Sequence, residues 1–221
     1  MGKNKFSVKP VDALIAAILA FRTNNSSVVR FESTEQKQVD NKQLIFKYFE
    51  STPAFSDLEL HELTTEAEQL KLFLEQRLTF NAITGSKTSD FLSSVVNAIT
   101  KETISSRDFG IVAWAPKLYA DTQRIDDVKI KLMNCGITSR YVSKPGTKTT
   151  LTFTSITVKY LKEYDSFIHH GHDIDGNLIM FFNKTKIEGT TEISGRVKAH
   201  RIDERINRAQ VTVLNYVKVI A

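Results

Sequence analysis

The hydrophobic period of this chain changes near residue 148, and this change constrains the possible fold more than any other feature. Before it, apolar residues recur about every 3.6 positions, the spacing of an amphipathic α-helix. After it, apolar and polar residues alternate, as in a β-strand with one buried face. The sequence therefore predicts an α+β protein, with a helical domain over residues 1–137, a linker over 138–148 and a β-domain over 149–221.

The first half predicts a series of helices ending in recognisable stop signals. Thr88 or Ser89 suits the start of one of them, because a hydroxyl there accepts a hydrogen bond from a free backbone N–H. Pro116 is expected to kink or stop the helix that contains it, and Gly136 to close the last helix in a left-handed conformation. The expected helices cover residues 11–22, 35–49, 57–80, 89–99, 109–119 and 121–133.

The second half predicts a small closed barrel. Asp175-Gly176 joins two of its strands as a tight hairpin, because glycine accepts positive φ. A bulge near Ser155 is expected, since the apolar positions of the long first strand shift there from odd to even. Five strands are too few for an immunoglobulin-like sandwich, whereas a closed barrel leaves no free edge. The expected strands cover residues 149–163, 167–174, 178–183, 191–202 and 209–220.

The order of these strands resembles an OB-fold, with the connector from Thr185 to Gly189 standing where that fold often has a helix. Residues 172–182 look like its second hairpin, and residues 193–200 with 212–219 resemble its last two strands. This part is similar to C-terminal OB-like domains of phage-encoded proteins for single-stranded DNA binding and replication. The resemblance implies a non-enzymatic single-stranded DNA-binding protein acting in phage DNA replication or recombination. The chain departs from the usual single-stranded DNA-binding protein in lacking an acidic C-terminal tail.

Composition is compatible with this interpretation without being specific to it. The net charge is +5 and the isoelectric point about 9.2, a modest basic excess that suits nucleic acid. The single cysteine, Cys135, fits a reducing compartment, so we expect a cytoplasmic protein, in the host cytoplasm if phage-encoded. No apolar run reaches the ~18 residues that span a bilayer, so no membrane contact is expected.

Basic and aromatic residues of the β-domain form the expected binding site. Single-stranded nucleic acid requires cations for its phosphates and aromatic faces for its bases. The alternative is that the charges form a solvated barrel face and the aromatic rings form its core. The candidates are Lys159, Tyr160, Lys162, Tyr164, Phe181, Lys184, Arg196, Lys198, His200, Arg201, Arg205, Arg208, Tyr216 and Lys218.

Two other kinds of site have weaker signals. His170 and His172 lie two apart on a strand and so share a face, the best arrangement in this chain for a transition metal and for a metal-dependent enzyme. A polar hairpin in water explains them equally well. No nucleophile elbow, Walker A loop or dinucleotide fingerprint occurs. We therefore expect neither an enzyme nor a cofactor.

The helical half contains the candidates for protein contacts. The apolar segment from Val11 to Phe21 and the lone Trp114 are suited to a protein partner or to self-association, although both suit a helical core as well. The alternative function is a protein-interaction module, such as a polymerase regulator or virion component, whose barrel contacts only protein.

Overall fold

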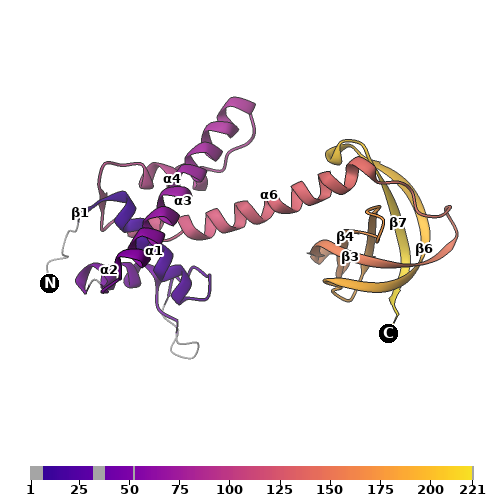
Figure 1. Cartoon of the computed structure of the whole chain (residues 1–221), viewed down its shortest axis with the longest axis horizontal. Coiled ribbons are helices and arrows are strands. Elements are labelled where there is room, and N and C mark those ends of the chain that lie inside the picture. Colours follow the sequence, from indigo (N-terminus) through magenta and orange to yellow (C-terminus); the bar gives the residue numbers. More distant parts are fainter. Residues whose placement is uncertain (1–6, 32–37, 52, 221) are drawn as a thin grey trace. The chain divides into compact units, whose positions relative to one another are not determined.

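The computed structural model describes residues 7–31, 38–51 and 53–220, which form two compact units. The first unit comprises residues 1–123 and the second residues 124–221. Helix α6 (Ala115–Thr138) belongs to both units in sequence (Figure 1). Its second half, which we expected in the helical domain, therefore groups with the barrel.

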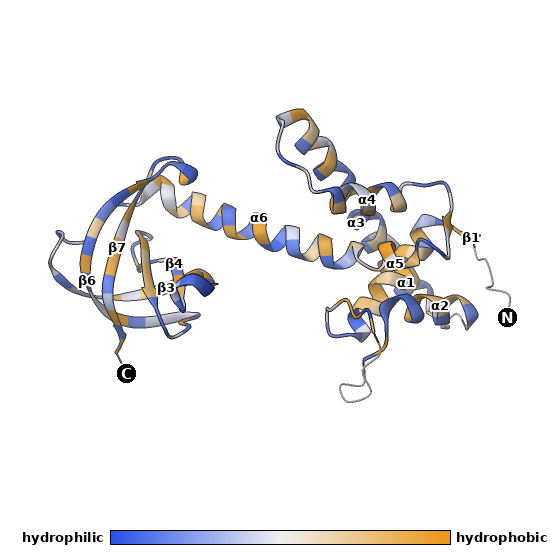
Figure 2. Cartoon of the chain, turned by 180° about the vertical axis from the view of Figure 1, so that it is seen from behind, coloured by the Kyte–Doolittle hydropathy of each residue, from blue (hydrophilic) through white to orange (hydrophobic). Residues whose placement is uncertain are grey.

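The first unit is built around the apolar helix α1 (Pro10–Thr23), which packs against α2, α3 and α5. Leu14 of α1, Ile45 of α2, Leu70 of α3 and Phe109 of α5 are all fully buried. Figure 2 shows α1 and α5 as strongly apolar elements of this unit. The apolar segment from Val11 to Phe21 thus forms the helical core. The further elements are α2 (Asn41–Glu50), α3 (Asp57–Thr84), α4 (Asp90–Ile99), α5 (Phe109–Val112) and the paired strands β1 (Ser7–Val8) and β2 (Ile104–Ser105).

One predicted helix start is confirmed and another is shifted. Ser89 caps α4 by accepting a hydrogen bond from the N–H of Leu92 at 3.2 Å, as predicted. Helix α2 begins at Asn41 rather than at residue 35, with Asp40 as its cap; residues 35–37 lie outside the described residues.

The helix expected over residues 109–119 is interrupted between Val112 and Ala115, close to Pro116 as predicted, whereas the prediction for Gly136 was wrong. Pro116 lies at the second position of α6, where a missing N–H costs nothing because the first N–H groups of a helix have no partner within it. Gly136 lies inside α6, which continues to Thr138. A Cβ at Gly136 would lie 2.8 Å from Cγ2 of Ile206. This glycine is therefore needed for a close approach rather than for a turn.

The second unit contains a closed barrel with the strand order β3-β4-β5-β7-β6 (Figure 1). Strands β5 and β7 pair in parallel and all other pairs are antiparallel. This is the arrangement of an OB-like barrel, and the register shift between Ser155 and Thr157 confirms the predicted bulge. The strands are β3 (Lys148–Leu161), β4 (Ser166–His172), β5 (Leu178–Asn183), β6 (Thr190–Asp203) and β7 (Ala209–Val219).

The barrel interior is filled by large side chains around one buried histidine. Phe153 and Phe181 pack edge to face, with their ring centroids 4.9 Å apart. The ring of His169 stacks on Phe181 at 4.6 Å. Ile187, from the connector between β5 and β6, is buried in the same cluster, and its N–H donates to Nε2 of His169 at 3.0 Å. This connector carries a buried side chain at the place where other OB-folds often have a helix.

A second apolar cluster lies on the outside of the barrel. Met180 of β5 and Val213 of β7 are buried there, and Leu132 and Met133 of α6 pack against the cluster. The end of α6 therefore covers the outer surface of these two strands. The burial of both surfaces explains why β5 is apolar at the four consecutive positions from Leu178 to Phe181.

The predicted linker is partly buried. Val142 packs against the interior cluster, and its N–H donates to the hydroxyl of Thr212 at 2.9 Å. Tyr141 stacks on His200 with the ring centroids 4.1 Å apart. The segment that contains Tyr141 and Val142 therefore packs on the barrel. Its polar sequence did not predict this packing.

Candidate nucleic-acid interface

The structure separates most of the predicted binding residues into three groups. The first is the β3–β6–β7 face, which consists of Arg196, Lys198, Tyr216 and Lys218 together with Lys148, a residue that the sequence analysis missed. The second is the β3–β4 end, which consists of Lys159, Tyr160, Lys162, Tyr164 and Lys184. The third is the β6–β7 hairpin with Arg201, Arg205 and Arg208.

The pairing register of the strands brings the cations of the β3–β6–β7 face close together. Lys148 of β3 pairs directly with Arg196 of β6, and Ser194 of β6 pairs with Lys218 of β7. Val197 and Ile193 point into the barrel, so the residues that alternate with them point outward. Side chains at directly opposed positions lie about 5 Å apart at Cβ. The register therefore concentrates positive charge that is scattered in the sequence.

The cations of this face have no counter-ion among the residues that the structure describes. In the part of the chain that the structure describes, no ion pair involves Lys148, Arg196 or Lys218. The same holds for Lys198, and all four are exposed. Their charge is therefore available to an external anion without the loss of an internal pair.

Tyr216 stands out on this face because its backbone holds the ring in solvent. The register shifts between Ser194 and Arg196, so β7 carries an extra residue there, which makes a bulge. Tyr216 lies in this bulge with φ of 53°, and it is 80% exposed. A bulky residue in the left-handed region is strained, and such strain is concentrated at functional sites.

The arginines of the β6–β7 hairpin are less available to an external ligand than the composition of the hairpin indicates. Arg205 donates to Asp203 through Nε at 3.2 Å, and Arg208 pairs with Glu204 at 3.6 Å. Burial by itself raises the pKa of Asp203, but hydrogen bonds from Arg205 and its charge outweigh this, so the pKa lies below its usual value. The two arginines already have partners in the folded chain.

His200 is held by the segment that precedes the barrel. Its Nε2 lies 2.9 Å from the carbonyl oxygen of Ser143, and its ring stacks on Tyr141. Simple strand alternation would place His200 on one open face with Arg196 and Lys198. A second register shift, between Val197 and Ala199, turns it away from that face.

One of the aromatic residues predicted to bind bases, Phe181 of β5, does not reach the surface. Phe181 is fully buried, so its prediction as a stacking platform was wrong. Its neighbour Phe182 is 45% exposed instead. Tyr160 and Tyr164 are exposed, and the hydroxyl of Tyr160 donates to Asp165 at 2.6 Å, a bond that raises the pKa of Tyr160.

Helix α6 covers part of the surface that OB-folds commonly use. OB-folds bind oligonucleotides on the outer face of their second and third strands, which here are β4 and β5. Leu132 and Met133 of α6 pack against the cluster that contains Met180 of β5, and Ile168 of β4 packs against the same cluster. The open part of this face is the end that carries Lys159 and Phe182.

The histidine pair does not form a metal site with the described residues. His170 and His172 alternate on β4 as expected. Nδ1 of His172 lies 2.7 Å from the carbonyl oxygen of Asp173, and burial lowers the pKa of His170. Within residues 7–31, 38–51 and 53–220, no three His, Cys, Asp or Glu side chains are placed to hold a metal ion.

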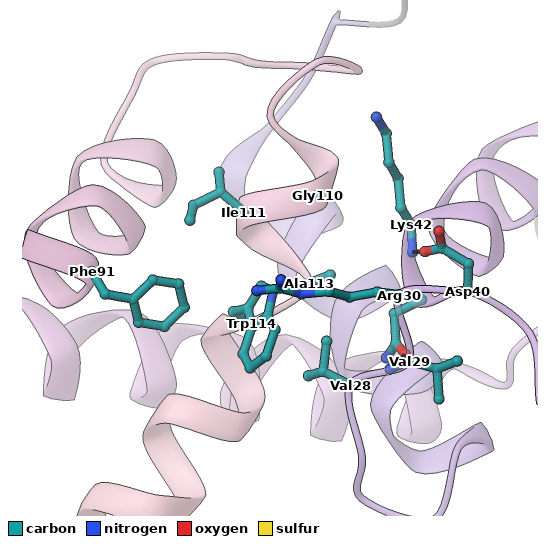
Figure 3. A pocket seen from close by; sticks show the side chains of 11 residues that line it. Val28, Val29, Arg30, Asp40, Lys42, Phe91, Gly110, Ile111, Ala113 and Trp114 are labelled. Atoms are coloured by element: carbon teal, nitrogen blue, oxygen red, sulfur yellow. Dashed lines mark hydrogen bonds between the residues drawn. The ribbon is translucent and has the colours of Figure 1, made fainter. Parts of the chain in front are cut away.

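Trp114 borders a pocket of about 340 Å³ in the helical unit (Figure 3). The guanidinium carbon of Arg30 lies 4.9 Å from the centre of its ring, and Phe91 meets it edge to face at 5.4 Å. Val28 and Ile111 line the same pocket. Trp114 is therefore half-buried and contacts other residues of its own unit on both sides.

Comparison with protein families finds no match to this chain, and comparisons with characterised proteins and with solved structures find none either. Function must therefore be argued from the geometry. In the residues that the structure describes, no helix has both the length and the apolar character needed to cross a bilayer.

Proposed function

We propose that this protein binds single-stranded nucleic acid, without catalysis, through the β3–β6–β7 face. The observation that carries the proposal is Tyr216, which projects from a bulge beside Arg196 and Lys218. An exposed aromatic ring offers a stacking surface for a base, worth roughly 1–3 kcal/mol per base. The cations around it supply the charge that a phosphate backbone requires.

These cations form no ion pair within the described part of the chain, so their full charge can act on a bound phosphate backbone. A cation that neutralises a phosphate releases a counterion from the nucleic acid, and this release drives binding. Arg196 and Lys218 can neutralise a phosphate without giving up an ion pair to another described residue. Arg205 would have to divide its hydrogen bonds between the phosphate and Asp203. The β3–β6–β7 face is therefore favoured over the more arginine-rich hairpin.

The proposed setting is phage DNA replication or recombination in the host cytoplasm. Support for it comes from the resemblance of the barrel sequence to OB-like domains of phage replication proteins. In this proposal, the helical unit provides contacts with a protein partner or with a second copy.

A fluorescence anisotropy titration with labelled oligo-dT tests the proposal. For single strands, the slope of log affinity against log salt is about −0.7 per neutralised phosphate. The double variant Arg196→Ala/Lys218→Ala should reduce the magnitude of the slope by about 1.4 and weaken binding at low salt. Arg205→Ala/Arg208→Ala removes the same charge from ion-paired positions and is the matched control. Equal loss in both double variants would contradict the location of the site.

A protein-interaction module is the second candidate, and the position of α6 favours it. Because α6 covers part of β4 and β5, a strand cannot lie across the whole of that face. If oligo-dT does not bind even at low salt, the nucleic-acid proposal fails and this candidate is preferred.

A further inference from the structure

A pocket of about 370 Å³ lies on the outside of the barrel, between α6 and the β6–β7 hairpin. All of its lining residues belong to the second unit. Its walls are largely apolar, as in most sites for small ligands. The apolar side chains come from Ile125, Val128, Leu132 and Met133 of α6 and from Ile206 of the hairpin.

Two polar side chains that form no hydrogen bond with the described residues meet in this pocket. Thr157 and His170 are directly opposed in the β3–β4 ladder, and both line the pocket. Among the described residues, neither side chain makes a hydrogen bond. Burial lowers the pKa of His170 and so favours its neutral ring, which offers one donor and one acceptor.

Two cations and one carboxylate, that of Asp203, line the same pocket. Lys129 is exposed and unpaired within the described residues. The side chain of Arg205 is 87% exposed. It uses two N–H groups on Asp203, and a guanidinium has five. Arg205 can therefore hold Asp203 and an external anion together.

We propose that this pocket binds a small planar aromatic anion. Its ring system would lie between α6 and Ile206, its polar edge would bond to His170 and Thr157, and its acidic group would contact Arg205 and Lys129. A purely apolar ligand would cover His170 and Thr157 without bonding to them, which is costly. The charged lining is net positive, because Asp203 is already bonded to Arg205 and Lys129 has no such partner among the described residues, and this disfavours a cation. The proposal is independent of the β3–β6–β7 face.

The fluorescent probe 1-anilinonaphthalene-8-sulfonate has this chemistry and tests the site on the full chain. We expect saturable binding at one site. Arg205→Ala should weaken it about tenfold, as the loss of a charge-assisted hydrogen bond does. The matched control is Arg208→Ala, an ion-paired arginine of the same hairpin that does not line the pocket. It should bind the probe as the parent does.

Filling the pocket provides a second readout. Met133→Trp and Val128→Trp each place a large ring in the pocket and should abolish probe binding, with circular dichroism confirming the fold. Two variants are used because one of them can fail to fold. Probe binding that is not saturable overturns the proposal. So does equal weakening by Arg205→Ala and Arg208→Ala, or parental binding in a folded filling variant.

Competition identifies the source of the anion. A nucleotide and a non-nucleotide aromatic acid share the required chemistry, so thymidine monophosphate and 2-naphthoate are each titrated against bound probe. Displacement by thymidine monophosphate assigns the pocket to a nucleotide, and displacement by naphthoate alone assigns it to an aromatic acid. Displacement by neither overturns the proposal.

Discussion

The hydroxyl of Ser139 accepts a hydrogen bond from the backbone N–H of Leu178 at 2.8 Å. The same hydroxyl donates to the carbonyl oxygen of Gln210 at 2.6 Å, and Ser139 is almost fully buried. One side chain from outside the barrel thus joins the segments where the parallel strands β5 and β7 begin.

Ser139→Ala should lower the free energy of unfolding by about 1–3 kcal/mol, because it removes the hydroxyl partner of the buried N–H of Leu178 and of the partly buried carbonyl of Gln210. Urea denaturation of the two proteins measures the difference. Ser194→Ala is the control, since the hydroxyl of Ser194 makes no hydrogen bond among the described residues and its loss should change stability by less than about 0.5 kcal/mol. If both variants behave alike, the bridge contributes nothing.

Gly136→Ala should destabilise the second unit although alanine favours helices by about 1 kcal/mol. The new Cβ would lie 2.8 Å from Cγ2 of Ile206 and 3.0 Å from Cβ of Ala209, and overpacking of this kind costs about 1–3 kcal/mol. Gly110→Ala is the matched helical control, because its Cβ would meet only the flexible side chain of Lys42 at 3.7 Å. We expect it to be neutral or stabilising. A thermal melt of each variant separates the two outcomes.

The barrel should lose stability on mild acidification. Burial lowers the pKa of His169 below its ordinary 6.5, and Nδ1 of this ring has no partner in the described residues. Between the folded and unfolded pKa values, the unfolded chain binds more protons, so stability rises with pH. The stability that the neutral ring of His169 contributes is fully present above about pH 6.5. It is lost as the pH falls towards the lowered pKa of His169 in the folded state.

Unfolding by urea between pH 7.5 and 5 measures this dependence. His169→Gln should flatten it, since a glutamine can still accept from Ile187 but does not titrate in this range. His170, whose pKa burial also lowers, should contribute in the same direction, and His170→Gln isolates its share. A pH dependence unchanged in both variants would exclude these histidines as its source.

Tyr216→Gly should separate stability from binding. Glycine accepts the positive φ of 53° that strains a tyrosine by roughly 1–2 kcal/mol, but it makes the unfolded chain more flexible, which costs roughly 0.5–1 kcal/mol. Stability should therefore stay within about 1 kcal/mol of the parent. Binding of oligo-dT should weaken by roughly 5- to 160-fold, which corresponds to the loss of about 1–3 kcal/mol of stacking.

Tyr216→Phe serves as its control and should retain binding, because stacking requires the ring rather than the hydroxyl. If the glycine variant binds oligo-dT as tightly as the parent, Tyr216 is not a stacking platform.

Local patterns determined most of the fold. The alternation after residue 148 and the Asp175-Gly176 turn located the strands to within about two residues. The change of parity at Ser155 located the bulge. An extra residue in a strand shifts the alternation by one position, so the apolar side chains change from odd to even numbers while facing the same side. The cap at Ser89 followed from a hydroxyl and a nearby N–H. Each of these signals depends on a few consecutive residues.

Tertiary packing decided the features that local patterns do not contain. The residues 178–182 are apolar throughout, so their sequence does not show that Phe181 points inward and Phe182 outward. The polar composition around Ser139 suggested a linker because nothing local reveals that distant strands supply its partners. The sequence around Gly136 suggested a helix end. The side chain that excludes a Cβ at this position belongs to Ile206, which lies 70 residues further along the chain.

The composition of the sequence by itself determined that this chain is basic and that its barrel carries cations. Which cations are free was decided by the tertiary structure: the register sets Arg196 beside Lys148 on an open face, while Asp203 and Glu204 pair with the hairpin arginines. The physical reason is that charge belongs to a residue, whereas its availability depends on neighbours that only the folded chain brings together.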